Sequence, residues 1–334
     1  MMRESLTILS SRNCGKKHVS YNTVLGMENV FCQCSGHSPL LLKGCFYNIN
    51  RLFQMFRFSQ KYGIPDYLAL RKIKHCRGKV FFAVMGLNEA VIFKHTLKKC
   101  HKKLILYVFD CWESQWEKWK KIFDEINPWA ICFAYKKSKE HFSELISNCW
   151  FLPQSMDSRY FHDYEKGKER LFMQVGRRTD KLHNMVINYL KSNGIQNSRD
   201  NYIYEKKKGS LIFEDTSQLA EEMGKTYFFI AAPQNIENDK YTGSISEVTA
   251  RFYEAMACKT LIIGIKPEDS FDELFPYYEA MIEVNEESFE RVINQFLEDR
   301  EYYNAIVDRN FNYVMQHHRW ENRFESLLTM IKLA

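Results

Sequence analysis

The stretch Gly243–Gly264, GSISEVTARFYEAMACKTLIIG, decides the predicted fold, because it reads as a loop, a helix and a buried strand in succession. Its last part, Thr260–Ile263, is a short apolar run closed by glycine, which is the pattern of a strand covered on both faces. The part before that run reads as a helix that follows a loop containing glycine and serine. This order predicts an open parallel α/β sheet in which a helix N-terminus faces an anion such as phosphate.

A capping-box pattern marks the beginning of the predicted helix. Ser244 is followed three residues later by Glu247, which predicts that the helix begins near residues 245–246. Glu247, Arg251 and Glu254 then follow one another at steps of four and three, so we expect them on one polar face. Gly243 and Ser244 form a candidate anion-binding turn at this helix N-terminus. For Glu247 two readings stay open, a capping residue or a ligand contact.

The same segment resembles the donor-binding segment of retaining nucleotide-sugar glycosyltransferases with two Rossmann-like domains, the GT-B type, group 1. In one subgroup the helix reads E-x-T-x-R-x-x-E-x-x-A, and this chain matches every named position, at Glu247, Thr249, Arg251, Glu254 and Ala257. The chain departs from the broader family in two respects. Six residues instead of seven separate the two glutamates, and Lys259 replaces the glycine that usually follows the helix. The resemblance is therefore closer for Glu254 than for Glu247.

Composition restricts the class of protein. A chain of 334 residues suits two domains, and 45% hydrophobic with 26% charged residues is typical of chains that bury substantial cores. No apolar run approaches the roughly 20 residues that span a bilayer, and the N-terminus lacks the apolar region of a signal peptide, which predicts a cytoplasmic protein. The ten cysteines include no CxxC pair, so we expect reduced, mostly buried thiols and no zinc site.

Charge is distributed unevenly along the chain. Residues 1–150 contain 24 Lys and Arg against 11 Asp and Glu, whereas the remaining residues contain 23 against 30. The basic half favours contact with an anionic acceptor or an anionic membrane surface at the inner face of the membrane. The alternative is a solvated cationic surface. Because no motif that reads nucleic acid accompanies the charge, nucleic acid is not an expected partner.

Apolar runs and helical patterns alternate in both halves, which predicts two doubly wound parallel sheets. Strands are expected at residues 6–9, 80–84, 104–109, 130–133, 149–152, 171–175, 202–204, 227–231 and 260–263. Helices are expected at residues 48–60, 88–99, 113–126, 180–191, 216–223, 286–297, 300–316 and 319–332. The domain limits follow as 1–160 and 161–315, with a polar linker over 153–168. By resemblance, a terminal helix over 316–334 crosses back to the N-terminal domain, and the two domains face each other.

A second candidate site follows the predicted strand at 171–175, in the sequence LFMQVGRRTDK. Gly176 lets a backbone approach a phosphate closely, while Arg177, Arg178 and Lys181 supply positive charge. An exposed basic turn would have the same sequence. Because this turn and the Gly243–Gly264 stretch belong to one predicted domain, we favour a shared anion site.

The resemblance implies a role for each of these residues. The ribose hydroxyls of the donor would bind Glu254, and the transferred sugar would lie near Glu247. The departing nucleoside diphosphate would be stabilised by Arg177 and Lys181, which makes these two and Glu247 the candidate catalytic residues. The other expected donor contacts are Gly176, Arg178, Gly243, Ser244, Thr249, Arg251 and Glu254.

The N-terminal half offers fewer candidates, on the acceptor side. Gly15 and His18 lie in NCGKKH, directly after the first predicted strand, and Asp110 ends the strand-like run LILYVFD. Side chains at such strand ends bind ligands in α/β proteins, although a hydrogen-bonded structural aspartate is the alternative for Asp110. The chain contains no D-x-D pair, so we expect cationic side chains and helix dipoles, without a metal or other cofactor, to hold the diphosphate.

The resemblance implies a glycosyltransferase that uses a nucleoside-diphosphate sugar and retains anomeric configuration, and the missing D-x-D pair predicts that it works without a metal. Its acceptor would be a glycan, a lipid-linked molecule or a small molecule. Two alternatives remain open on the sequence. One is a protein of the same fold that binds a nucleotide sugar without catalysis, and the other is an enzyme of this fold that acts on a different nucleotide.

Overall fold

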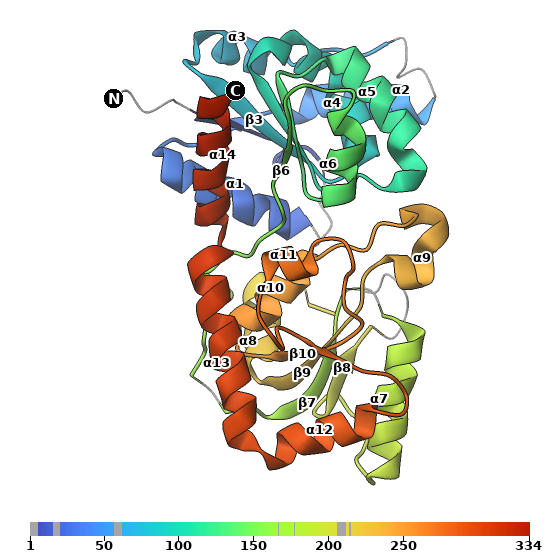
Figure 1. Cartoon of the computed structure of the whole chain (residues 1–334). Helices are drawn as coiled ribbons and strands as arrows, with labels where there is room; N and C mark the ends of the chain where they lie inside the picture. The colour runs from blue at the N-terminus through green and yellow to red at the C-terminus, as the bar shows by residue number, and fades with distance from the viewer. Residues whose placement is uncertain are drawn as a thin grey trace. The chain divides into compact units, whose positions relative to one another are not determined.

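The computed structural model describes residues 6–15, 21–56, 62–165, 167–176, 178–205, 212–213 and 215–334. The chain forms two compact units (Figure 1). Unit 1 comprises residues 1–154, 240–245 and 320–334, and unit 2 comprises residues 155–239 and 246–319. These limits differ from the predicted domains, because residues 155–160 and 316–319 cluster with unit 2 and residues 240–245 with unit 1.

Unit 1 is built on a six-stranded parallel sheet with the strand order β2-β1-β3-β4-β5-β6. The strands are β1 Leu6–Ser10, β2 Leu40–Leu41, β3 Lys79–Val84, β4 Leu104–Val108, β5 Ala130–Phe133 and β6 Cys149–Phe151. The helices are α1 Asn22–Ser35, α2 Gly44–Met55, α3 Tyr67–His75, α4 Leu87–Lys99, α5 Trp116–Ile126, α6 Lys136–Ser143 and α14 Trp320–Leu333. Two 3-10 turns, η2 His101–Lys103 and η3 Glu113–Gln115, flank β4.

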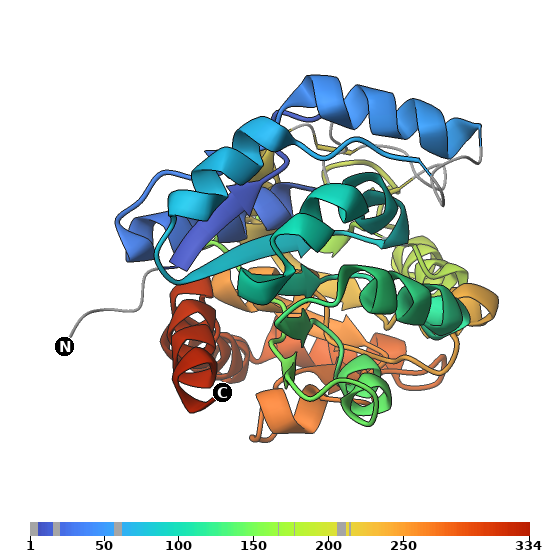
Figure 2. The same ribbon diagram turned by 90° about the horizontal axis from the view of Figure 1, so that it is seen from above.

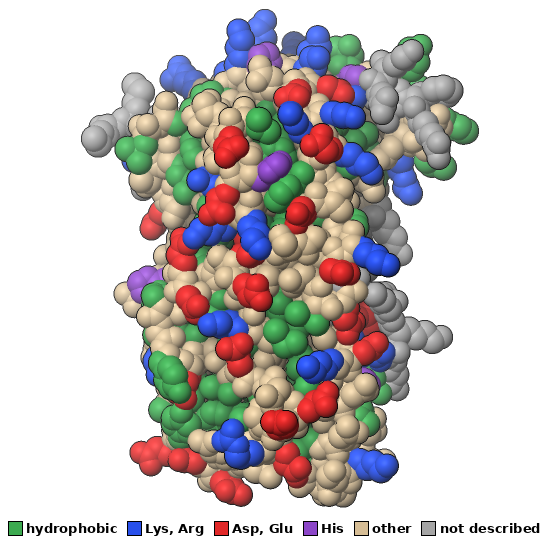
Figure 3. Space-filling model, turned by 45° about the vertical axis from the view of Figure 1, so that its right-hand side comes forward, with side chains coloured by type: hydrophobic (Ala, Val, Ile, Leu, Met, Phe, Trp, Pro, Cys, Tyr) green, Lys and Arg blue, Asp and Glu red, His purple; other side chains and the backbone are tan. Residues whose placement is uncertain are grey.

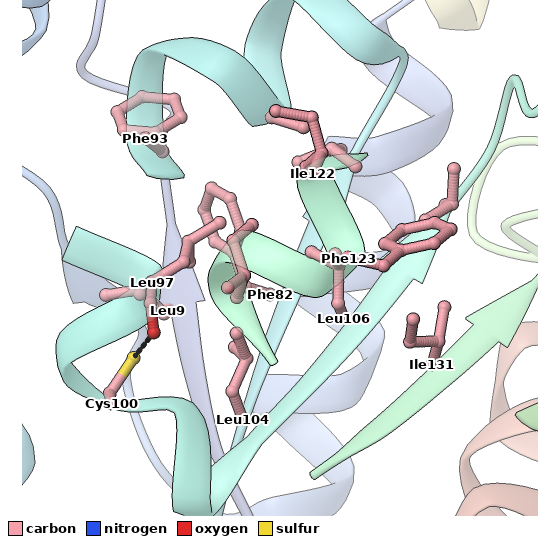
Figure 4. Packing of buried hydrophobic residues seen from close by; sticks show 14 of the residues in the cluster. Leu9, Phe82, Phe93, Leu97, Cys100, Leu104, Leu106, Ile122, Phe123 and Ile131 are labelled. Carbon is pink, nitrogen blue, oxygen red and sulfur yellow. Dashed lines mark hydrogen bonds between the residues drawn. The ribbon is translucent and has the colours of Figure 1, made fainter. Parts of the chain in front are cut away.

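Alternate residues of these strands face two separate apolar cores, because neighbouring side chains on a strand point to opposite faces. On one face Phe82 and Leu106 pack with Phe93 of α4 and Phe123 of α5, as Figure 4 shows. On the other face the sheet packs against α1 and α14. Both faces of the sheet are therefore covered, as in other all-parallel sheets.

The C-terminal helix α14 completes the second core of unit 1, and it lies beside α1 (Figure 1). The ring centroids of Phe31 in α1 and Phe324 in α14 are 5.2 Å apart, and Phe31 also meets Trp320 edge-on at 6.3 Å. Arg323 donates from Nε to the carbonyl of Pro153 at 3.1 Å. The last residues of the chain thus belong to the same core as its first strand.

Unit 2 contains a five-stranded parallel sheet with the order β11-β10-β9-β7-β8. Its strands are β7 Arg170–Gln174, β8 Tyr202–Tyr204, β9 Thr226–Ala231, β10 Leu261–Gly264 and β11 Ile282–Glu283. Its helices are α7 Asp180–Ser192, α8 Thr216–Gly224, α10 Ala250–Ala257, α11 Phe271–Leu274, α12 Phe289–Glu298 and α13 Arg300–His317; α9 Asn235–Thr242 joins the two units in sequence. One face of this sheet is covered by α8 and α10, and the other by α7, α12 and α13.

The predicted fold class, two doubly wound parallel sheets, is confirmed. The sequence reading missed α1, α3, α6, α9 and α11 and the short edge strands β2 and β11. In α1 the N-cap residue Tyr21 makes no side-chain capping bond, and the helix buries residues around much of its circumference. The missing cap removes the polar residue that marks a helix start, and the wide burial removes the amphipathic period. These are the two signals by which a helix is identified in a sequence. Helix α2 ends at Met55, short of the predicted residue 60, and residues 57–61 lie outside the described part.

No helix among the described residues is both long and apolar enough to cross a bilayer. Several cysteines contribute to the hydrophobic cores of the two units. In Figure 4 the Cys100 thiol, in the core of unit 1, lies against the carbonyl of Leu97, to which it donates at 3.3 Å.

This buried thiol leads to a prediction about alkaline pH. Burial raises the pKa of Cys100 to about 12, whereas a thiol in the unfolded chain ionises near pH 8.5–9. The neutral thiol therefore stabilises the fold below about pH 9, and this contribution is lost as the pH rises toward 12, because the unfolded chain releases its proton first. We expect the free energy of unfolding of the original chain to fall as the pH rises above about 9. In Cys100→Ala this fall should be smaller, by up to ~1.4 kcal/mol per pH unit.

Urea unfolding under reducing conditions, on both sides of pH 9, measures this difference. Cys45→Ala removes an exposed thiol and serves as the control, because it should keep the pH dependence of the original chain. An unchanged pH dependence in Cys100→Ala would contradict the assignment.

Candidate functional site

Two sequence motifs meet at the carboxyl edge of the sheet in unit 2. Gly176 follows β7 and has a φ of +107°, a backbone conformation that favours glycine. A Cβ added to Gly176 would lie 3.9 Å from Cγ of Arg251, a residue in the first turn of α10. The glycine turn after β7 and the helix after residue 249 are therefore neighbours, as expected if they share one ligand.

An ion pair fixes the position of the Arg251 side chain. The guanidinium of Arg251 donates to the carboxylate of Glu254, one turn later on α10. The Glu254 side chain is 5% exposed, whereas the Arg251 side chain is 30% exposed. The buried carboxylate thus holds a partly exposed cation beside a glycine turn. Guanidinium and backbone N–H groups in this arrangement are able to bind a phosphate or another anion.

The predicted capping box does not form. Helix α10 begins at Ala250, after the N-cap residue Thr249, and not near residues 245–246. The reason is that the residues before it are bound to the loop at 268–270. The N–H of Ser246 donates to Asp269 at 2.6 Å, and the N–H of Glu268 donates to Ser246 Oγ at 3.1 Å.

Glu247 therefore lies outside the helix and does not share a helical face with Arg251 and Glu254, contrary to the prediction. It is 3% exposed, and its carboxylate accepts a hydrogen bond from Ser270. The sequence signal for this arrangement was the polar run at 268–270, but nothing in the local pattern relates that run to the segment before α10. Glu247 thereby ties the approach to α10 to the loop after β10.

Gly243 and Ser244 occupy a different environment from the one predicted. They cluster with unit 1, where the N–H and Oγ of Ser244 both donate to the carboxylate of Glu113, at 2.6 and 2.8 Å. The carbonyl of Ser244 accepts from Lys137 at 2.7 Å. These hydrogen bonds lower the pKa of Glu113. Since α10 begins only at Ala250, Gly243 and Ser244 do not form its N-terminus.

The basic turn after Gly176 is only partly described, because Arg177 lies outside the described residues. Arg178 is held by its neighbours: its Nε donates to Asp180 at 3.1 Å, and its Nη1 to the carbonyl of Glu205 at 3.3 Å. Lys181 is exposed in the first turn of α7. At the beginning of that helix, the N–H of Asp180 donates to the carboxylate of Glu237, a contact that the sequence did not predict.

The acceptor-side candidates belong to unit 1. Gly15 has a φ of +71°, and an added Cβ would collide with the ring of Tyr47. His18 lies outside the described residues. Asp110 accepts a hydrogen bond from the hydroxyl of Tyr135 at 3.0 Å, in agreement with the structural alternative.

Sequence reasoning missed a buried polar cluster at the carboxyl edge of the sheet in unit 1. Ser10 donates to Glu28 at 2.6 Å, and Arg12 donates to the same carboxylate oxygen at 2.9 Å. Next to them, Tyr21 and Ser11 both donate to Glu89, at 2.8 and 2.9 Å. Burial raises the pKa of Glu28. The signal was the polar Ser-Ser-Arg sequence at residues 10–12, at the end of the first strand. This cluster fixes the backbone at the end of β1.

The surroundings of Lys259 show how the chain accommodates a lysine where the family pattern has glycine. Lys259 follows α10 with a φ of +51°, a left-handed conformation that glycine adopts without a steric penalty. Its ammonium pairs with Asp163 at 2.8 Å and Asp308 at 2.7 Å. The hydrogen bonds to these two carboxylates raise the pKa of Lys259. Position 259 thus has a backbone conformation that favours glycine, and the lysine that occupies it is held by two ion pairs.

Among the residues that the structure describes, no three His, Cys, Asp or Glu side chains gather in a way that could hold a metal ion.

Comparison with known proteins finds one family-model match, in the C-terminal part of the chain. Residues 208–329 match the family model described as glycosyl transferase-like, a range that includes Glu247, Arg251 and Glu254. No curated protein matches the sequence. The resemblance to GT-B glycosyltransferases inferred from the sequence is thus confirmed by the family match over these residues.

Solved structures share the fold along the whole chain. The structure of Anabaena HepE in complex with UDP-glucose has a TM-score of 0.60 at 9% identity, over 98% of this chain and 99% of that one. A glycosyltransferase from Rickettsia africae gives 0.58 at 12% identity, over 100% and 99%. A UDP-forming α,α-trehalose-phosphate synthase from Burkholderia vietnamiensis gives 0.51 at 8% identity, over 100% of both chains. At these identities the likeness shows the GT-B fold.

The backbone at Lys259 allows a test of why the chain tolerates lysine there. Lys259→Ala loses both ion pairs and keeps the unfavourable left-handed conformation, whereas Lys259→Gly loses the pairs and relieves the conformation. We expect Lys259→Gly to be more stable than Lys259→Ala by about 1 kcal/mol.

Urea unfolding of the two variants measures this difference directly. The same pair of substitutions at Lys332, near the end of α14, should show the reverse order, because glycine is unfavourable in a helix. Equal stabilities at position 259 would mean that its backbone conformation carries no cost.

Proposed function

We propose that this protein is a glycosyltransferase that transfers a sugar from a nucleoside-diphosphate sugar to an acceptor, with retention of configuration and without a metal ion. One observation carries the proposal. Gly176 and the Arg251–Glu254 pair, chosen from separate motifs, lie together at the carboxyl edge of one parallel sheet. Ligands bind at this edge in open α/β folds, and the glycosyl transferase-like match covers the helix that bears the ion pair.

The roles in donor binding follow from burial and charge. We assign the donor ribose to Glu254, whose carboxylate would accept hydrogen bonds from hydroxyl groups. The diphosphate would bind Arg251 and the backbone at Gly176, with Arg178 and Thr249 at the margins of the same edge. Because the Glu254 carboxylate already holds the guanidinium, the two residues would act together: the same pair would orient both the ribose and the phosphates.

The transfer step would require little covalent participation by the protein. The bond between the sugar's anomeric carbon and the diphosphate oxygen breaks, and the acceptor oxygen forms a new bond to that carbon. The acceptor's proton passes to an oxygen of the departing diphosphate. Arg177 and Lys181 are proposed to stabilise the charge that develops there. Glu247, proposed from the sequence as a catalytic residue near the sugar, would in this geometry act by positioning, through Ser270.

The acceptor and the cellular setting are also proposals. Gly15, His18 and Asp110 remain the candidates for acceptor contacts, and a glycan, a lipid-linked molecule or a small molecule fits equally. We place the protein in the cytoplasm, with contact between its basic half and anionic surfaces. The main alternative is a nucleotide-sugar-binding protein without transferase activity, which the shorter spacing between Glu247 and Glu254 keeps open.

The ribose contact is tested by Glu254→Gln. Loss of hydrogen bonds to a charged group costs about 1.5–3 kcal/mol, so affinity for the nucleotide sugar and for the free nucleoside diphosphate should fall roughly ten- to a hundredfold. A thermal-shift panel of nucleotide sugars first identifies the donor, because a ligand at a hundred times its Kd stabilises by about 2.7 kcal/mol. Titration calorimetry with the donor then compares the variant with the original chain.

The matched control is Glu301→Gln, an exposed residue of unit 2 in the first turn of α13, which should leave binding unchanged. If Glu254→Gln binds both ligands normally while still folding, the proposed donor site is wrong. If no nucleotide sugar shifts the melting curve of the original chain, the function as a whole is wrong.

Metal independence gives a separate prediction. Release of nucleoside diphosphate from the donor identified in the panel should continue after exhaustive EDTA treatment, because cationic side chains are proposed to hold the diphosphate. The readout is the rate of nucleoside diphosphate release, with and without EDTA and added Mn²⁺. A loss of activity that Mn²⁺ restores would contradict the mechanism. A chain that binds the donor yet releases nothing, with or without a mixture of acceptors, would favour the non-catalytic alternative.

A further inference from the structure

Helix α2 of unit 1 exposes its apolar side to solvent. Ile49, Leu52, Met55 and the C-cap residue Phe56 are 37%, 52%, 67% and 66% exposed. Leu52 follows Ile49 by three residues, and Met55 and Phe56 follow Leu52 by three and four, so the four side chains form a single stripe. The outward stripe of a surface helix is ordinarily polar. Contiguous exposed apolar residues of this kind mark an interaction surface.

The neighbouring helix α3 contributes exposed apolar and basic residues. Tyr67 and Leu68, in its first turn, are 61% and 55% exposed. Arg71, Lys72 and Lys74 follow them and are also exposed. Within the described part of the chain none of these three cations forms an ion pair. In Figure 3, Lys and Arg side chains gather on the end of unit 1 that is uppermost in the view.

The two helices are joined into one surface. Buried Asn50 of α2 exchanges two hydrogen bonds with the backbone of Ile64, at 2.8 and 3.0 Å. Buried Asp66 caps α3 through the N–H of Ala69 at 2.9 Å and also accepts the N–H of Lys43, before α2, at 2.7 Å. Figure 2 shows α2 and α3 along the same flank of unit 1. The exposed residues of both helices thus lie on a single rigid support.

The charge of this segment is strongly one-sided. Residues 40–80 contain nine Lys and Arg and one acidic residue, Asp66, whose carboxylate is buried and already accepts two backbone N–H groups. The basic character of residues 1–150 is therefore concentrated around the apolar stripe. A partner that fits must present negative charge at its surface and accept apolar side chains beneath it.

We infer that the α2–α3 surface, defined by Ile49, Leu52, Met55, Phe56, Tyr67, Leu68, Arg71, Lys72 and Lys74, docks on an anionic membrane. The apolar side chains enter the boundary between headgroups and acyl chains, and the cations remain among the lipid phosphates. A soluble polyanion would bind the cations, but it would leave the four exposed apolar side chains of α2 in water. The inference deepens the proposed contact between the basic half and anionic surfaces and rests on that part of the proposed function, whereas donor binding and sugar transfer are tested separately.

The test is co-sedimentation of the full chain with vesicles. One set is phosphatidylcholine, and the other is phosphatidylcholine mixed with phosphatidylglycerol. We expect binding to the anionic vesicles only, weakening as NaCl rises. Each cation near an anionic surface strengthens binding about fivefold, so Arg71→Gln/Lys72→Gln/Lys74→Gln should weaken it on the order of a hundredfold. Leu52→Ser/Met55→Ser/Phe56→Ser should weaken it more than about tenfold, because it removes the inserting side chains.

The matched control is Lys118→Gln/Lys120→Gln/Lys121→Gln, which removes the same charge from exposed positions of α5 and should lower binding far less. All the substituted side chains are exposed, and unchanged circular dichroism and melting confirm that the variants fold. Absence of binding to anionic vesicles at low salt would overturn the proposal. So would equal losses in the two basic variants, which would show a response to net charge alone.

A third arm separates membranes from soluble polyanions. Dextran sulfate should bind through the cations, with no effect of the serine variant. If the serine variant also binds anionic vesicles as well as the original chain does, the apolar stripe has no part in docking and the membrane assignment is wrong.

Discussion

The ion pair between Arg251 and Glu254 is the interaction on which the candidate site depends. A buried carboxylate without a partner is costly, so Glu254 requires the guanidinium, and the guanidinium is thereby directed to the turn at Gly176. Packing of α10 against the sheet makes this possible, since nearly every residue of the helix is buried. The cation at the sheet edge is therefore positioned by the core, and a ligand would meet a charge that is already oriented.

The strand and helix patterns of the sequence predicted both sheets because buried parallel strands are short, apolar and separated by helices. The same reasoning failed where a segment satisfied its polar groups at long range. Glu247 looks like a capping residue in sequence, but Ser270, which follows β10, binds its carboxylate. Ser244 looks like a helix cap, but it binds Glu113, far earlier in the chain. Local patterns contain no information about such partners.

The parts of the site that depend on residues close together in the sequence were predictable. The requirement for glycine at position 176 and the three-residue step from Arg251 to Glu254 are both visible in the sequence. The cluster of Ser10, Glu28 and Glu89 is not, because its members lie on three elements of unit 1, β1, α1 and α4. The apolar stripe on α2 was hidden for another reason. Its residues read as ordinary core residues, and only their exposure distinguishes them.

The left-handed backbone at Lys259 has a consequence for the order in which residues can change during evolution. While lysine occupies this position, Asp163 and Asp308 both contribute to holding it, so the loss of either aspartate is costly. Once glycine replaces the lysine, neither aspartate has this role, and Asp163 keeps only its other contacts, such as the N–H of Glu165. Lys259, Asp163 and Asp308, which are distant in the sequence, are therefore energetically coupled. In homologues with glycine at position 259, the ion pairs no longer require an acidic residue at either of the other two positions.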